Sequence, residues 1–509
     1  MEQNKRMPFV ILAMALGLFM SSLDNTIVSA SISQVIQDIG GFEKMSWIFT
    51  AYMLAATSTM LVFGKMSDLF GRKLFYLIGI SLFLIGSALC GTAQNIDQLI
   101  AYRVIQGVGS GAIFPISFTI IYSVSTSPKQ AAKMSGIFAG IFGISSVLGP
   151  QIGTWISEAS WLGWRWCFYV NVPFGILSII ALMFALKESK SDQKPKVDYL
   201  GTLLLITSTV LLLLGLEWGG KDYAWDSVQI ISMFSGAAVA IALFLWVETK
   251  AAEPILPLEI FKNKMVLGTS IVVFCQGAIM FSAITYLPIL SVAVMGNENS
   301  NGVLTPMMFP IMIGAIIGGF LCTKIPFRTI MIISMGMGIF EAYMLGSITH
   351  ETAKWTVTLV MIMMGLVVLG PLMSVSQNAV AQSVDMKYMG IASSVVGFWR
   401  SIGGVMGAAI TATIVNSDLK EKMLDFAAAS KMPADQIGKM AKPEILMQKD
   451  ANLPPQLVEF MRSALETALH HGFMLALIAG CLGLVVAFFV GGDRYVMRQA
   501  AEETGKAAS

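Results

Sequence analysis

The chain has 509 residues, of which 55% are hydrophobic and only 13% are charged, and its formal net charge is +2. A soluble protein of this length needs a charged surface that this composition cannot supply, so the soluble class is excluded. The basic residues are spread between apolar runs rather than clustered, which excludes a nucleic-acid partner. The composition therefore predicts an all-α polytopic membrane protein in a lipid bilayer.

A helix that spans a membrane needs about 20 predominantly apolar residues. Fourteen runs of the sequence meet this requirement, and we expect each to be a transmembrane helix. They lie near residues 8–33, 46–63, 74–93, 98–123, 131–157, 165–186, 198–217, 228–247, 264–295, 302–322, 328–348, 354–382, 389–416 and 470–492.

The basic residues between these runs predict the orientation, because cytoplasmic loops carry an excess of Lys and Arg. If the N-terminus is cytoplasmic, the short outer loops hold only Lys44, Arg165, Lys221 and Lys354. The exception is the outer segment 417–469, whose middle lies far from either neighbouring span, where the rule is weak. An even number of spans puts both termini on one side. We therefore expect a multi-pass protein of the cell membrane with cytoplasmic N- and C-termini.

A long glycine-rich run occurs twice. Residues 133–156 return as residues 387–410, and at this single offset of 254 seven identical residues coincide, including Gly136 with Gly390 and Gly149 with Gly403. Seven coincidences in register indicate a duplicated half, which in a membrane protein is typical of transporters.

The duplication predicts two six-helix halves if the seventh and eighth spans are an insertion. We expect an N-terminal half over 1–186, a linker with two inserted helices over 187–263, a C-terminal half over 264–492 and a cytoplasmic tail over 493–509. Within the C-terminal half, residues 417–469 form an extracytoplasmic loop with helix-compatible segments. That loop is interpreted as a helical hairpin or lid, or equally as a spacer.

Two charged residues lie deep inside predicted spans of the N-terminal half. Asp24 is in the first span, where a charge costs roughly 2.5–3.5 kcal/mol, so it is expected to face a cavity or a partner. We interpret it as a proton-binding carboxylate; the alternative is an acid that only orders the helix. Arg103, at a similar depth in the fourth span, could bind that carboxylate, or could instead extend its side chain to the outer interface.

The loop between the second and third spans reads GKMSDLFGRK over residues 64–73. Its glycines allow tight turns, and its acid can cap a helix or pair with an arginine across the interface between the halves. A loop that holds one conformation and then releases it is a gate. The counterpart at the 254 offset, residues 318–327, lacks the acid, so the gate is expected to be one-sided. The candidate gating residues are Gly64, Asp68, Gly71, Arg72 and Lys73.

Further features lie in the C-terminal half and at the outer face. Glu341 and Arg400 are deep charges that line a cavity or pair with each other. Many methionines of the second half suit a cavity for varied substrates, although core packing is the simpler interpretation. The aromatic cluster at 161–169 predicts a belt at the outer membrane interface.

The sequence has no motif for ATP binding, metal binding or nucleophilic catalysis. There is no GxxxxGK[ST] motif for ATP, no cluster with metal-ligand spacing and no nucleophile–base arrangement. We therefore expect no enzyme activity, no cofactor and no metal.

Taken together, these motifs resemble the major facilitator superfamily, in its fourteen-helix drug:proton antiporter branch, the EmrB/QacA group. The resemblance covers nearly the whole chain. It is carried by LDNTIV at 23–28, GKMSDLFGRK at 64–73, RVIQGVGSGA at 103–112, LGPQIG at 148–153, WRWCFYVNVPFG at 164–175 and EPILPLEIF at 253–261.

The resemblance implies alternating access between the two halves, with the proton gradient as the energy source. It gives Asp24 the proton-coupling role, Arg103 the relay and residues 64–73 the gate. The depth of Glu341 in its span, apart from the resemblance, makes it a further candidate acid for proton coupling. It also implies an antiporter bend at Gly149, Pro150 and Gly153. Ser145 and Thr154 depart from this antiporter motif, which usually has glycine at both places.

Three functions follow as hypotheses. The leading one is a bacterial proton-coupled exporter of amphipathic, cationic toxic compounds, of the kind that causes antibiotic resistance. The second is a dedicated exporter of one endogenous lipid, siderophore or antibiotic-like molecule. The third is a membrane sensor that no longer transports. The expected partners are small-molecule substrates, protons and the lipid bilayer, and no partner protein is predicted.

Overall fold

A computed structural model describes residues 2–159, 161–186, 196–296, 301–430 and 455–491. The α-helices are α1 Glu2–Ile39, α2 Trp47–Phe70, α3 Arg72–Thr92, α4 Ile96–Val124, α5 Pro128–Glu158, α6 Trp166–Tyr169, α7 Asn171–Ala185, α8 Tyr199–Trp218, α9 Val228–Glu248, α10 Lys264–Ile289, α11 Asn301–Leu321, α12 Phe327–Leu345, α13 Lys354–Met363, α14 Gly370–Ala381, α15 Met389–Ser430 and α17 Pro455–Phe489. Short helical segments of other types are η1 Phe42–Lys44, η2 Leu258–Lys262, η3 Leu290–Val294, η4 Met364–Leu369 and η5 Met386–Tyr388.

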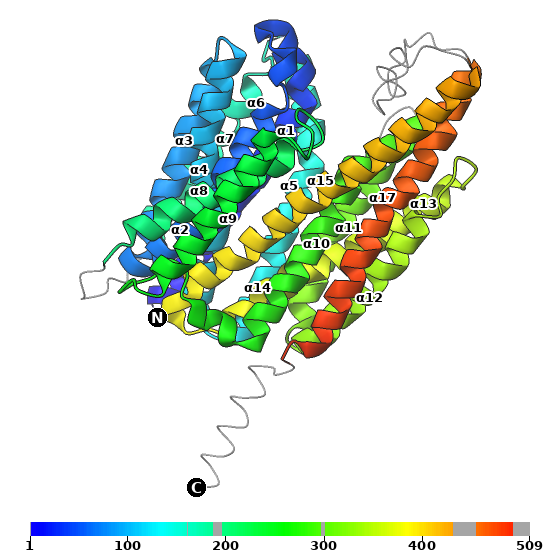
Figure 1. Cartoon of the computed structure of the whole chain (residues 1–509). Coiled ribbons are helices and arrows are strands. Elements are labelled where there is room, and N and C mark those ends of the chain that lie inside the picture. Colours follow the sequence, from blue (N-terminus) through cyan, green and yellow to red (C-terminus); the bar gives the residue numbers. More distant parts are fainter. Residues whose placement is uncertain (1, 160, 187–195, 297–300, 431–454, 492–509) are drawn as a thin grey trace.

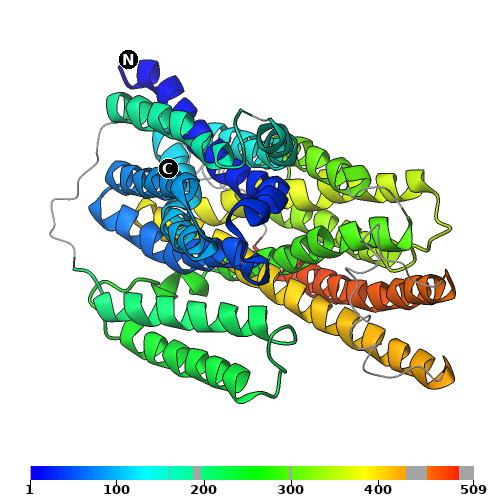
Figure 2. The ribbon, with the colours of Figure 1, turned by 90° about the horizontal axis from the view of Figure 1, so that it is seen from above.

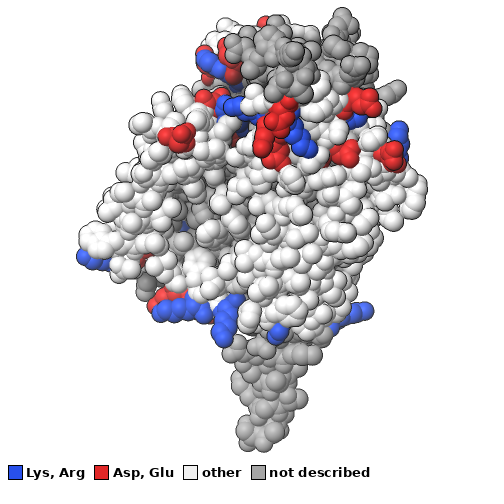
Figure 3. All heavy atoms as spheres, turned by 45° about the vertical axis from the view of Figure 1, so that its right-hand side comes forward, with Lys and Arg blue, Asp and Glu red and all other residues white. Residues whose placement is uncertain are grey.

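The described residues contain 14 helical stretches that are long and apolar enough to cross a membrane, as predicted. Helices satisfy every backbone polar group within the segment, which a bilayer interior requires. The space-filling view shows acidic and basic side chains gathered at two opposite ends, with a broad uncharged band between them (Figure 3). The chain is therefore a multi-pass membrane protein.

The helices form two halves with a helix pair beside them. Helices α1–α7 lie in one half, and α10–α17 in the other (Figure 1). The inserted helices α8 and α9 pack on each other, and α8 also contacts α2 and α15. The pair lies in front of the N-terminal half in Figure 1, and the view from above shows it at one side of the molecule (Figure 2). This confirms the predicted fold of two six-helix halves with two inserted helices.

The halves meet through two glycine-lined helix crossings near the face that carries the N-terminus, called here the N-terminal face. At the first crossing α5 packs on α11, and a Cβ atom added at Gly136 would lie 2.9 Å from the Cα of Gly319. At the second, α15 packs on α2, and a Cβ added at Gly390 would lie 2.5 Å from the carbonyl oxygen of Gly64. Gly136 and Gly390 occupy equivalent positions of the sequence repeat. The duplication has therefore placed the same close backbone contact at both crossings between the halves.

Farther along the same two helices, the repeated glycines contact their own half instead. Gly149 and Gly153 of α5 lie against Thr26 and Ile27 of α1. In the other half, Gly403 and Gly407 of α15 lie against α10. The halves thus join at the N-terminal face and diverge toward the opposite face, which Figure 1 shows as a V-shaped arrangement.

The last two long helices extend beyond the apolar band. The 42-residue helix α15 and the 35-residue helix α17 continue past the ends of their predicted spans. The two helices pack on each other, and the rings of Phe426 and Phe460 in their extensions stack at 4.3 Å. Leu419 and Met423 of α15 and Met461 and Leu465 of α17 are buried in the same apolar cluster. Parts of 417–469 are therefore helical, while residues 431–454 lie outside the described residues.

The α5–α11 crossing provides a test of the glycine contacts. Gly136→Leu should destabilise the protein by about 1–3 kcal/mol, because the side chain forces two backbones apart. Gly336→Leu is the matched control, since a Cβ there meets nothing within 4 Å. Thermal unfolding in detergent, followed by intrinsic fluorescence, should give a lower Tm for the first variant alone. Equal Tm values would show that the crossing tolerates separation.

Candidate functional site

Asp24 lies at the centre of a fully buried polar cluster between four helices. Its carboxylate accepts hydrogen bonds from Arg103 (2.5 Å) and Gln106 (2.8 Å) of α4 and from Asn171 (2.9 Å) of α7. All four side chains have 0% exposed surface. Asp24 therefore has the partners that a charge inside a membrane requires.

Arg103 is held from several directions. Its Nη1 also donates to Gln106 Oε1 at 2.9 Å, and its Nε donates to the carbonyl oxygen of Ile48 at 3.1 Å. Its guanidinium carbon lies 4.0 Å from the centre of the Tyr52 ring, within the range of a cation–π interaction. The side chain does not extend to the outer interface, so the snorkelling interpretation is wrong and the pairing with Asp24 is observed.

Local sequence positions the donors. Arg103 and Gln106 are three residues apart on α4, which puts them on one helix face. Asn171 opens α7, and Pro173 follows in the first helical turn, where its missing N–H costs no hydrogen bond. The Asn171 amide also donates to Ser87 Oγ, which in turn donates to the carbonyl oxygen of Phe168.

Sequence reasoning missed Gln106, Asn171 and Ser87 as members of this cluster. The first two lie inside motifs that were recognised, at 103–112 and 164–175, but neutral amides there have no signal of their own. The three-residue spacing of Arg103 and Gln106 was the one available clue.

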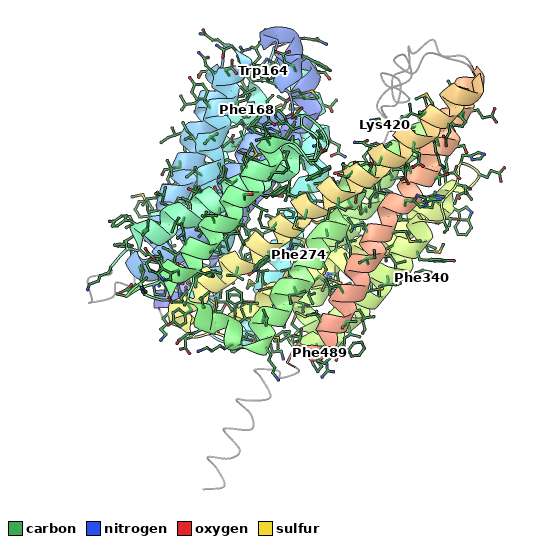
Figure 4. All side chains as sticks on the ribbon, viewed as in Figure 1. Trp164, Phe168, Phe274, Phe340, Lys420 and Phe489 are labelled. Atoms are coloured by element: carbon green, nitrogen blue, oxygen red, sulfur yellow. The ribbon has the colours of Figure 1, made fainter. Side chains whose placement is uncertain are left out.

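The aromatic segment next to Asn171 is divided between surface and core. Trp161 is 76% exposed and Trp166 is 47% exposed, which fits an interfacial belt. Trp164 and Phe168 are buried, against the belt prediction: Trp164 donates to Asp38, and the centre of the Phe168 ring lies 6.0 Å from the guanidinium carbon of Arg103. Both side chains lie toward the end of the N-terminal half that is away from the N-terminal face (Figure 4).

The segment predicted as a gating loop, residues 64–73, is helical except at Gly71, because it contains the end of α2 and the start of α3. This segment holds the second half at the N-terminal face. Asp68 accepts hydrogen bonds from the backbone N–H groups of Gly390 (2.8 Å) and Ile391 (3.0 Å), at the start of α15. A carboxylate is favoured there because a helix N-terminus presents free N–H groups and a positive dipole end. The contact joins α2 of one half to α15 of the other.

The other residues of this segment have separate contacts. Arg72 donates to the carbonyl oxygen of Met386 at 2.7 Å and lies 3.8 Å from the Asp68 carboxylate. Gly71 has φ 108°, which glycine adopts readily. Lys73 instead donates to the carbonyl oxygens of Met183 and Leu186 at the end of α7, inside its own half. Gly64 makes the close α2–α15 contact described above.

The antiporter-type residues lie against the stretch of α1 that carries Asp24. Pro150 is inside α5, and a side chain at Gly149 would overlap Thr26, two residues after Asp24. Gly153 packs on the carbonyl oxygen of Ile27. The α5 glycines thus let this helix approach α1 beside the buried carboxylate.

Glu341 and Arg400 do not pair with each other. Arg400 donates to Gln276 (3.3 Å) and Ser376 (3.1 Å), whereas both carboxylate oxygens of Glu341 are buried without a hydrogen-bond partner among the described residues. Glu341 is 2% exposed, on α12. The structure therefore keeps Glu341 apart from the Asp24 cluster, in the other half.

Most of the methionines of the second half pack in its core. Ten of them are buried in one cluster, and four more pack against it while partly buried. The buried ones are Met265, Met280, Met307, Met331, Met335, Met361, Met364, Met373, Met423 and Met461, and the partly buried ones are Met295, Met308, Met337 and Met344.

Comparisons with known proteins agree with this architecture. The Major Facilitator Superfamily model matches residues 14–408. Multidrug resistance protein 3 of Bacillus subtilis is 37% identical over 505 residues, which cover 98% of each chain. The multidrug transporter protein MdtP of the same organism is 34% identical over 511 residues, covering 96% of this chain and 94% of MdtP.

A solved structure supports the fold. The major facilitator proton:xylose symporter XylE has a TM-score of 0.60 with 14% identity, and the match covers 97% of each chain. The family predicted from the motifs is confirmed. The chain belongs to the major facilitator superfamily of membrane transporters and has its fourteen-helix form.

Proposed function

We propose that this protein is a drug:proton antiporter, which exports amphipathic, cationic toxic compounds by alternating access and uses the proton gradient as its energy source. The observation that carries the proposal is the fully buried Asp24 carboxylate with its partner Arg103. The names of the two Bacillus relatives, both multidrug proteins, support a broad range of substrates over one endogenous compound.

Protonation of Asp24 would change the electrostatic balance of the site. The buried arginine is compensated by the carboxylate, and removing that charge leaves Arg103 uncompensated in a medium of low dielectric constant. Such a state is costly unless the surrounding helices rearrange or admit water. Because α1 carries Asp24 and also packs on α5, the rearrangement would reach the α5–α11 crossing between the halves.

We place the N-terminal face in the cytoplasm, since the Lys and Arg residues between the spans gather on that side. In this orientation the contact of Asp68 with α15 closes the cytoplasmic side, and the halves diverge toward the outside. The described arrangement then corresponds to an outward-facing state, and release of the Asp68 contact opens the path for substrates from the cytoplasm.

Asp24→Asn tests proton coupling. In proteoliposomes with an imposed pH gradient, the variant should lose gradient-driven movement of a fluorescent lipophilic cation, because an amide cannot bind and release the proton. Exchange of labelled for unlabelled cation without a gradient should persist. Asp222→Asn, an exposed acid, is the control. Gradient-driven movement that survives Asp24→Asn would transfer the coupling role to Glu341 or elsewhere.

Asn171→Leu tests the role of the surrounding donors. The substitution removes a hydrogen bond to the charged carboxylate, worth about 1.5–3 kcal/mol. The initial rate of gradient-driven transport should therefore fall by roughly tenfold or more. The measurement is the initial transport rate in proteoliposomes, and thermal unfolding in detergent shows that the variant is folded. A rate equal to that of the wild type would show that transport does not depend on the Asn171 donor.

Asp68→Asn tests the gate. Loss of the charge-assisted contacts to Gly390 and Ile391 should shift the population toward an open cytoplasmic side. Spin labels at Lys129→Cys and Lys324→Cys, both exposed and in different halves, report the separation once the exposed Cys481 is replaced by serine. The variant should show longer distances, and Asp385→Asn, an exposed acid on the same face, should not. Identical distance distributions would mean that Asp68 does not control the gate.

A further inference from the structure

The segment between α9 and α10 contains EPILPLEIF, residues 253–261, to which neither the fold nor the coupling site gives a role. It runs along the N-terminal face from the inserted helices to the C-terminal half. Its residues line two neighbouring cavities of different character.

The first cavity is an apolar groove of about 650 Å³ between the inserted helices and the rest of the protein. Side chains of α8, α9, α10 and α15 line it, among them Leu205, Phe244, Phe274 and Trp399. Figure 4 labels Phe274 on α10. At its rim Ile241, Leu245 and Leu267 are 39–47% exposed on the apolar band. The groove therefore opens toward the bilayer, and its volume is that of a small-molecule site.

The second cavity, called here the vestibule, is a charged hollow of about 660 Å³ at the N-terminal face. Its lining has four acids and two lysines, so its formal charge is 2 − 4 = −2. Glu253 contributes an Oε2 atom that is buried without a hydrogen-bond partner among the described residues. The acids are Asp68, Glu248, Glu253 and Glu259, and the lysines are Lys65 and Lys387.

The two cavities adjoin, because Leu258 lines both of them. An apolar groove at membrane depth that leads to an acidic vestibule at the membrane surface matches a molecule with an apolar body and a cationic head. An anionic headgroup would meet repulsion from the excess of acids.

We propose that the groove and the vestibule form a peripheral site that takes cationic amphiphiles from the inner leaflet, with the apolar part in the groove and the positive head beside Glu253. This inference rests on the proposed function, since the peripheral site would bind the same class of compounds that the exporter is proposed to transport. The 253–261 segment and the inserted helices are the structural basis of the site.

The site also adjoins the gate. Asp68 lines the vestibule while it holds the N-terminus of α15, and Lys387 and Tyr388 just before α15 line the same hollow. A cation in the vestibule competes with the α15 N–H groups for the Asp68 carboxylate. Loading of this site would therefore favour opening of the cytoplasmic side.

The test is photoaffinity labelling of the full-length protein in phosphatidylcholine nanodiscs. The probe is a long-chain alkyltrimethylammonium with a diazirine in its tail, and its neutral counterpart has a tert-butyl group in place of trimethylammonium. Peptide mass spectrometry should locate the cationic label on 253–274 and 398–402, with little labelling by the neutral probe.

Two variants and two controls make the result specific. Glu253→Gln should lower the labelling about fivefold, the upper range for a partly exposed ion pair. Leu258→Trp, which fills the junction, should abolish it and lower the transport rate of the same cation. Leu243→Trp, which is 48% exposed on α9 outside the groove, and Asp222→Asn should match the wild type. Thermal unfolding confirms that each variant is folded.

Equal labelling by the charged and neutral probes, or labelling that survives Glu253→Gln, would overturn the proposal and make the groove an ordinary site for bilayer lipid. Labelling only at residues outside both cavities would also overturn it. These results leave the proposed function intact if the wild type still transports the cation. Conversely, charge-dependent labelling without any transport would support the peripheral site and contradict the exporter.

Discussion

The structure depends on one constraint: a carboxylate and a guanidinium are buried together where a bilayer surrounds the protein. Water cannot solvate either group, so Asp24 and Arg103 must be satisfied by each other and by neighbouring dipoles. The structure provides these from α4, α7 and the first turn of α2, which together with α1 ties four helices of the N-terminal half to a single point. A change in the charge of the Asp24–Arg103 pair therefore alters the electrostatic energy of every helix that contributes a group to it.

The repeated glycines determine how such a change could reach the other half. Each half contributes one glycine-lined helix, α5 or α15, which leans on the opposite half near the N-terminal face and on its own half beyond it. Inside a bilayer the hydrophobic effect does not drive helices together, because the lipid tails are as apolar as the side chains. Close backbone contacts of this kind stabilise the association of helices through van der Waals packing instead. Only one of the two related crossings has an added acid, Asp68, so the interface is symmetric in packing but asymmetric in charge.

The sequence predicts much of this architecture because hydropathy directly reports which segments can be in lipid. It also identifies Asp24 and Arg103, since a charge inside an apolar run is conspicuous. Gln106 and Asn171 could not be found in the same way, because amides do not interrupt an apolar run. The contact between Asn171 and Asp24 joins positions 147 residues apart, and only tertiary packing brings them together. The pairing of Glu341 with Arg400 could not be decided either, because depth along a helix does not say which face a side chain occupies.

The paired extensions of α15 and α17 have a mechanical consequence. At 1.5 Å per residue, the 42 residues of α15 form a rod of about 63 Å, roughly twice the thickness of the hydrocarbon core. The stacked rings of Phe426 and Phe460 brace the projecting part against its neighbour, so it moves with the helices that it continues. The rod is therefore a lever arm: a small rotation of the C-terminal half near the membrane becomes a large displacement at the tip.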